Sequence, residues 1–98
     1  MAGKSYRRIA ALAVTEQILK YLSEQRGAVS ASEIAQALNI QYGTVMCHLA
    51  TIEEFGWVRK AGEHWELGLG LSLYWARSKS QLEGQLARIN SDLEALDG

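Results

Sequence analysis

The chain contains no proline, so glycine is the residue that punctuates its apolar periodicity. Its single cysteine, Cys47, excludes an internal disulfide, and Cys47 with His48 and His64 does not form a recognisable zinc spacing. No apolar run approaches the roughly 20 residues of a membrane span, and the N-terminal MAGKSYRRIA lacks the apolar stretch of a secretory signal. We therefore expect a cytoplasmic protein with no metal, no cofactor and no membrane partner.

Catalytic motifs are also missing. The sequence has no phosphate loop, no dinucleotide fingerprint and no motif around a nucleophile and a histidine. Gly68-Leu69-Gly70 lacks a third glycine, and the adjacent Glu53 and Glu54 cannot face each other on a helix. At 98 residues the chain is one domain and is short for an enclosed active site. We expect a protein that is not an enzyme.

Charge is nearly balanced over the whole chain but unevenly distributed. The formal net charge is −1, from ten Lys and Arg against eleven Asp and Glu. Residues 1–60 have a balance of +2, whereas residues 61–98 have a balance of −3. This asymmetry is compatible with a weakly basic binding half and an acidic tail that faces elsewhere.

Apolar spacing predicts three helices in the first half of the chain. The first extends from about residue 6 to 24, with apolar residues at helical spacing: Ile9, Leu12, Ala13, Ile18, Leu19 and Leu22. A capping box, Ser30 to Glu33, begins a short helix through Leu38, after a linker at residues 28–29 in which a brief strand can form. The third helix spans about residues 42–55, with Val45, Leu49 and Ile52 on one buried stripe and Gly56 at its end.

The second half of the chain predicts a hairpin and a long helix. Residues 57–60 and 64–67 alternate apolar with polar side chains, as half-buried strands do, with a turn at 61–63 and a hinge at 68–70. Residues 71–96 are expected to form a helix with a heptad seam that pairs two chains. The seam residues are Trp75, Leu82, Leu86, Ile89, Leu93 and Leu96.

The order of three helices, a hairpin and a helix predicts a mainly α fold with a small β-wing, a winged helix-turn-helix followed by a C-terminal dimerisation helix. Residues 14–70, above all SASEIAQALNIQYGTVMCHLATIEEFGWV and HWELGLGL, resemble the DNA-binding domain of IclR-type transcriptional regulators. The resemblance implies a DNA-binding domain over residues 1–70, a recognition helix at about 42–55 in the major groove and a wing at 57–67 on the backbone. Residues 71–98 are the expected dimerisation helix.

The resemblance and a helical wheel together indicate which side chains contact DNA. Base contacts are expected from the start of the recognition helix and its exposed side: Gln41, Tyr42, Gly43, Thr44 and Cys47. Backbone contacts are expected from helix starts and scattered cations: Lys4, Arg7, Arg8, Ser32, Thr51, Arg59, Lys60 and His64. His48 is expected to be a packed imidazole, and Trp57 and Trp65 are expected to close the small core rather than stack on single strands.

The function that we expect is sequence-preferring binding of double-stranded DNA by a homodimeric transcriptional regulator, with half-sites about one helical turn apart. No small-molecule effector is evident, because family members usually continue into an effector-binding domain and this chain stops after one long helix. The family also commonly has an arginine near the position of Cys47. That departure and the net charge of −1 favour an alternative, a winged-helix protein–protein adaptor that no longer binds DNA.

Overall fold

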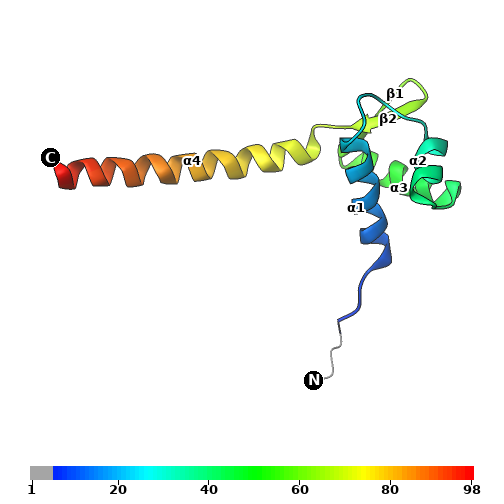
Figure 1. Cartoon of the computed structure of the whole chain (residues 1–98), viewed down its shortest axis with the longest axis horizontal. Coiled ribbons are helices and arrows are strands. Elements are labelled where there is room, and N and C mark those ends of the chain that lie inside the picture. Colours follow the sequence, from blue (N-terminus) through cyan, green and yellow to red (C-terminus); the bar gives the residue numbers. More distant parts are fainter. Residues whose placement is uncertain (1–5) are drawn as a thin grey trace.

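The computed structural model describes residues 6–98, and these form a small winged domain from which one long helix extends (Figure 1). The helices are α1 (Ala10–Ser23), α2 (Ala31–Leu38), α3 (Tyr42–Glu54) and α4 (Gly70–Asp97), and the strands are β1 (Val58–Ala61) and β2 (His64–Leu67). The predicted order of elements and the mainly α fold with a small β-wing are thereby confirmed.

The first helix begins later than the sequence predicts. Residues 6–9 are not helical, and Ile9 has an extended backbone with no side-chain cap, so the expected start near Tyr6 is wrong. Ile18 and Leu22 are buried as expected, but Ile9 and Leu12 are 61% and 63% exposed. Their periodicity does not bury them, because this end of α1 projects beyond the packed helices (Figure 1).

The helix-turn-helix unit forms as its local signals predict. The Ser30 hydroxyl accepts a hydrogen bond from the Glu33 amide at 3.1 Å, and the Glu33 carboxylate accepts one from the Ser30 amide, so the capping box is complete. Asn39 then adopts a left-handed conformation with φ of 55°, which ends α2 and turns the chain into α3. The predicted stripe of α3 is fully packed in the core.

A single apolar core unites α1, α2, α3 and the wing. Its buried members come from α1, the linker before α2, both helices of the helix-turn-helix unit and the hairpin: Ile18, Leu22, Val29, Ala31, Ile34, Val45, Leu49, Ile52, Val58 and Trp65. The predicted brief strand is present as one bridge, in which the amides of Val29 and Trp65 bond each other's carbonyl oxygens at 2.9 and 2.7 Å. This bridge attaches the wing to the start of the helix-turn-helix unit.

The wing is a two-stranded antiparallel hairpin whose turn contains Gly62 at a φ of +67°. Val58 pairs with Leu67, and Ala61 pairs with His64. The first strand starts one residue later than predicted, because the Trp57 amide donates to the Ile52 carbonyl at 3.1 Å and closes the end of α3. Gly56, with a φ of +76°, makes that closure possible.

The segment from Gly68 to Gly70 is a bonded corner, and its prediction as a hinge is wrong. The amide of Gly68 donates to the Trp57 carbonyl and that of Gly70 donates to the Gly56 carbonyl, both at 2.9 Å. A Cβ at Gly68 would overlap the Gly56 carbonyl, and one at Gly70 would lie 2.8 Å from the Phe55 oxygen. Both glycines are needed because backbone approaches backbone here.

Replacing Gly68 with alanine is therefore expected to destabilise the winged domain by roughly 1–3 kcal/mol, the usual cost of overpacking a site that cannot yield. The measurement is the midpoint of urea unfolding. Gly84→Ala is the matched control, since its Cβ would meet nothing within 4 Å. That control should raise helix stability by up to about 1 kcal/mol. Equal effects of the two variants would contradict the close packing at the corner.

Helix α4 contributes no buried residue. In Figure 1 it leaves the domain on the side opposite α2 and α3. The predicted seam side chains are all exposed, from 54% for Leu93 to 84% for Leu96. Within residues 6–98, no helix is long and apolar enough to cross a membrane.

Candidate nucleic-acid interface

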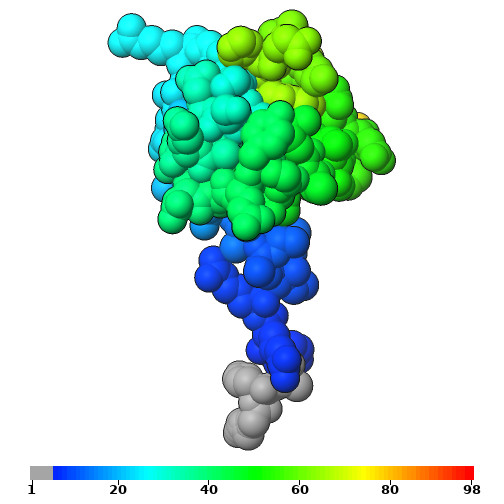
Figure 2. Space-filling view, turned by 90° about the vertical axis from the view of Figure 1, so that its right-hand side faces the viewer, coloured from blue at the N-terminus to red at the C-terminus, as the bar shows by residue number. Residues whose placement is uncertain are grey.

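The start of α2, the first turns of α3 and the wing meet around one shallow groove. Figure 2 looks onto the side of the domain on which these elements come together. The groove is lined by Ser30, Ala31, Ser32, Tyr42, Met46, Lys60, Glu63 and Trp65. Its volume of about 130 Å³ is below the roughly 300 Å³ of a small-molecule pocket, so it suits the edge of a larger ligand.

The start of α3 presents several of the predicted base-contacting residues to solvent. Tyr42 is the first residue of the helix and is 54% exposed. Gln41 precedes it with an exposed side chain that makes no capping hydrogen bond, so its amide is available to a ligand. Gly43 is exposed, and a Cβ there would meet nothing within 4 Å. These three residues form an open edge beside the groove.

The wing carries both positively and negatively charged side chains. The Lys60 ammonium lies 5.3 Å from the centroid of the Trp65 ring, which holds the side chain at the groove. Glu63, in the turn, lines the same groove. Arg59 donates to the Glu66 carboxylate across the hairpin at 2.8 Å, so its charge is paired. Among the described residues that line the groove, Lys60 is the one cation.

The start of α2 has a negative group of its own. The capping box holds the Glu33 carboxylate against Ser30, and it occupies the amides of Ser30 and Glu33. Ser32 is exposed in the first turn. An anion that approaches this helix start would therefore meet the Glu33 charge as well as the helix dipole.

Two predicted contacts lie in a different place. Cys47 and Thr51 line a hollow against α1 with Ala11, Leu12, Thr15 and His48, not the groove at Tyr42. The Thr51 hydroxyl donates to the Cys47 carbonyl at 2.8 Å. The His48 ring lies 2.8 Å from the Thr44 carbonyl through Nδ1 and 3.3 Å from the Ala11 carbonyl through Nε2, so it packs between α3 and α1 as expected.

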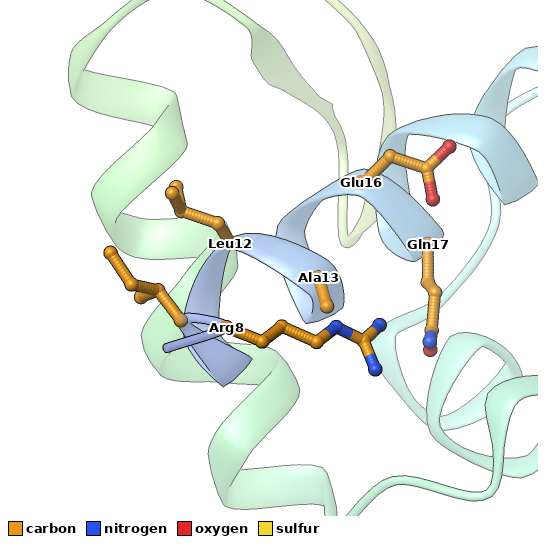
Figure 3. A pocket seen from close by; sticks show the side chains of 6 residues that line it. Arg8, Leu12, Ala13, Glu16 and Gln17 are labelled. Atoms are coloured by element: carbon orange, nitrogen blue, oxygen red, sulfur yellow. The ribbon is translucent and has the colours of Figure 1, made fainter. Parts of the chain in front are cut away.

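The remaining predicted cations are not brought to the groove. Lys4 lies outside the described residues. Arg7 and Arg8 are exposed in the non-helical segment before α1. In Figure 3 the Arg8 side chain extends along α1 in the direction of Gln17, where it lines an open hollow on that helix. His64 is exposed beside the turn of the wing, paired with Ala61.

Met46 and Glu63 line the groove, although the sequence did not single them out. Met46 follows Tyr42 by one helical turn, so the same helical wheel that selected Tyr42 contains a signal for it. No sequence pattern indicates that Glu63 lines the groove, because a residue in a hairpin turn can point to either side of the sheet. The structure thus adds one apolar and one acidic group to the predicted surface.

Trp57 and Trp65 belong to the core as expected, and the place of Trp75 in a paired seam stays a prediction. Trp65 is 3% exposed, and Trp57 packs on the core with its ring 5.0 Å from that of Phe55. Trp75 is 66% exposed on α4. Within residues 6–98, no three His, Cys, Asp or Glu side chains gather as ligands for a metal ion.

Comparison with known proteins agrees with this architecture. A family model described as the IclR helix-turn-helix domain matches residues 11–62. Among curated proteins, no match was found.

Two solved structures are similar to the chain. The Zalpha domain of Cyprinid Herpesvirus3 ORF112, in a structure of its binding mode to Z-DNA, has a TM-score of 0.54 and 34% identity over 57% of this chain and 93% of its own. An IclR family transcriptional regulator from Brucella abortus has a TM-score of 0.65 and 23% identity over 71% of this chain. The match spans only 28% of that regulator's length.

Proposed function

Because the chain belongs to the IclR helix-turn-helix domain family, we propose that it binds double-stranded DNA as a cytoplasmic, homodimeric transcriptional regulator. In this proposal α3 enters the major groove and the wing lies on the DNA backbone. The observation that carries it is the common surface formed by the start of α3, the start of α2 and the wing at one groove. The similar Zalpha domain, whose structure concerns binding to Z-DNA, supports a nucleic acid as the ligand of this fold.

The exposed start of α3 supplies the base contacts of the proposal. Gln41 pairs with an adenine, Tyr42 reaches a base edge or phosphate, and Gly43 allows the backbone to approach closely. Thr44 and Cys47 follow on the same helix, and the contact of Cys47 requires that a base also reaches the hollow that this residue lines against α1. Sequence preference comes from these residues, and no arginine is among them.

Phosphate contacts in the proposal come from several elements. Lys60 is the central one, because Trp65 holds its ammonium at the groove where α3 also lies. Ser32, Thr51 and His64 add polar contacts, whereas Arg59 must exchange Glu66 for a phosphate. The arm that precedes α1 reaches the backbone through Lys4, Arg7 and Arg8. With so few unpaired cations, affinity should start from a modest value and depend only weakly on salt, because few phosphates are neutralised.

Residues 71–98 are the dimerisation helix of the proposal, and residues 1–70 are the DNA-binding domain. The support is the exposed heptad seam of α4, which carries large apolar side chains and contributes nothing to the core of the winged domain. A dimer doubles the number of recognition helices that one molecule presents to DNA.

Lys60→Ala is expected to weaken DNA binding by roughly three- to tenfold at low salt and to reduce the salt slope by about one. Glu63→Lys should do the opposite, since it replaces an anion at the groove with a cation. The measurement is fluorescence anisotropy with mixed-sequence duplexes at salt concentrations from about 20 to about 200 mM. A duplex of alternating CG, able to adopt the left-handed form, is included as a second probe.

The control for this series is Arg77→Ala, which removes a charge from α4 on the side away from the seam. It should leave affinity nearly unchanged. If neither probe binds the wild-type protein at low salt, or if all three variants bind equally, the proposal fails. A selected preference among pooled sequences would establish sequence-preferring binding.

A protein–protein adaptor is the second candidate, favoured by the mixed character of the groove. Met46 and Trp65 are apolar members of its lining, and Glu63 offsets the charge of Lys60. An adaptor would retain a folded dimer that ignores both DNA probes at all salt concentrations. Sedimentation of the protein with and without duplex separates the two functions in one experiment.

A further inference from the structure

The seam of α4 has a charge pattern that discriminates between the two ways in which two copies can pair. With Leu82 assigned to position d of a heptad, position a holds Lys79, Leu86 and Leu93, and position d holds Trp75, Leu82, Ile89 and Leu96. None of these side chains is covered by another part of residues 6–98. Lys79 is the one charged residue in the seam between Trp75 and Leu96.

Parallel pairing brings like charges together. In a parallel two-stranded coil each a residue faces its own copy, so Lys79 would face the partner's Lys79. Position g faces position e five residues later in the partner, which sets Asp92 against the partner's Asp97 on both sides of the coil. Charges at positions e and g and a polar residue at position a are the features that decide orientation in such helices.

Antiparallel pairing removes both conflicts. In the register that places Leu86 against the partner's Ile89, Leu82 lies against the partner's Leu93, so every leucine of the central seam has an apolar neighbour. Lys79 then lies against the partner's Leu96, beside the carboxylate of the partner's Asp97, and Trp75 lies beyond this layer. Asp92 meets the neutral Gln85 of the partner subunit. Opposite charges of the two chains therefore meet only in this orientation, since the ion pair of Lys79 with Glu83, 3.7 Å apart, lies within one helix.

The relative orientation of the two α4 helices decides whether a dimer binds one DNA duplex or two. The groove at Tyr42 and Lys60 lies where α2, α3 and the wing meet, and α4 leaves the domain on the side opposite α2 and α3 (Figures 1 and 2). Antiparallel helices would place one winged domain at each end of the pair with the two grooves directed away from each other. In the register above, the two Gly70 residues are 35 residues apart along the pair, about 50 Å at 1.5 Å per residue.

We propose that two α4 helices pair antiparallel and that the dimer bridges two separate DNA segments instead of occupying adjacent half-sites of one duplex. The proposal rests on the DNA binding proposed above for the winged domain, and it adds the orientation of the partner and the number of duplexes held. Its basis is the charge complementarity of Lys79 with the partner's Asp97 and the direction in which the grooves face.

Disulfide trapping tests the orientation. Leu82→Cys and Leu93→Cys are each made in the full chain with Cys47→Ser, and one of them carries a size tag. The two are mixed and equilibrated in a glutathione buffer. Antiparallel helices place residue 82 beside residue 93 of the partner, so the expected cross-link joins tagged to untagged chains. Cross-links only between identical chains would show parallel pairing and overturn the proposal, as would the absence of any cross-link.

A charge-reversal variant tests the reason for the orientation. Lys79→Leu with Asp92→Lys removes the repulsion at position a and creates an attractive pair with the partner's Asp97 in the parallel form. The fraction of mixed cross-links is expected to fall by several fold. An unchanged fraction would contradict the charge argument.

A bridging assay tests the function. One duplex is fixed to beads and a second, fluorescent duplex of the same sequence is added with the wild-type protein. Retention of the second duplex is expected, with loss when Leu86 and Leu93 are replaced by aspartate. If the protein binds the beads but retains no second duplex, bridging is wrong while DNA binding stands. If the protein does not bind the beads, the proposed function itself fails.

Discussion

Trp65→Ala is expected to remove most of the stability of the winged domain and to leave it only marginally folded at 25 °C. The side chain is 3% exposed, and its backbone carries the bridge to Val29 that attaches the wing to the helices. Truncating a buried tryptophan to alanine costs roughly 3–5 kcal/mol, and a domain of this size has a free energy of unfolding near the lower end of 5–15 kcal/mol. The measurement is thermal unfolding followed by the helical circular dichroism signal.

Trp75→Ala is the matched control, because it makes the same chemical change on α4, where the side chain is 66% exposed. It should leave the unfolding midpoint of the winged domain unchanged. Similar losses of stability in the two variants would contradict the separation between a core tryptophan and a seam tryptophan. A stable Trp65→Ala domain would show that the wing is not essential to the core.

Leu86→Asp with Leu93→Asp is expected to convert the dimer to a monomer. Both side chains are more than half exposed in the single chain, so the substitution removes no contact of the winged domain. In a paired seam it would bury four carboxylates per dimer at apolar positions, which a short coil cannot tolerate. Sedimentation equilibrium should show at least a hundredfold rise in the dimer dissociation constant, on the order of 3 kcal/mol.

The control variant is Ser80→Asp with Ser91→Asp, which introduces the same two charges outside the seam. This variant should remain dimeric. The affinity of the seam variant for a single short duplex and the unfolding of its winged domain should stay the same, because each winged domain of an antiparallel dimer holds its own duplex. A seam variant that sediments as the wild-type protein does would show that α4 does not pair two chains.

Several features followed from sequence because their determinants lie within a few residues of one another. The capping box from Ser30 to Glu33, the buried stripe of α3 and the glycine that ends it each depend on contacts one helical turn apart. The same holds for the spacing of the α4 seam. The predicted start of α1 was wrong because apolar residues at helical spacing do not reveal whether a partner surface lies beside them. Ile9 and Leu12, which are both exposed, show this.

The candidate interface could be predicted only in part. Tyr42, Ser32 and Lys60 were selected from their places in the motif, and the structure brings them to one groove. Which sides of α3 remain open depends on where α1 packs, and α1 lies against Cys47 and Thr51. No local pattern contains that information, because Ala11 and His48 are 37 residues apart in the chain.

The sequence alone thus determined the order of the elements, the capping box of α2, the buried stripe of α3 with the glycine that ends it, and the heptad spacing of α4, since each arises from contacts between near neighbours along the chain. Tertiary structure decided the rest. It paired Arg59 with Glu66 across the hairpin, set Glu63 beside Lys60, and turned a presumed hinge into a corner where Gly68 meets the backbone of Gly56. These outcomes depend on the packing of segments that are distant in sequence, and the physical reason is that charge and steric contact act through space.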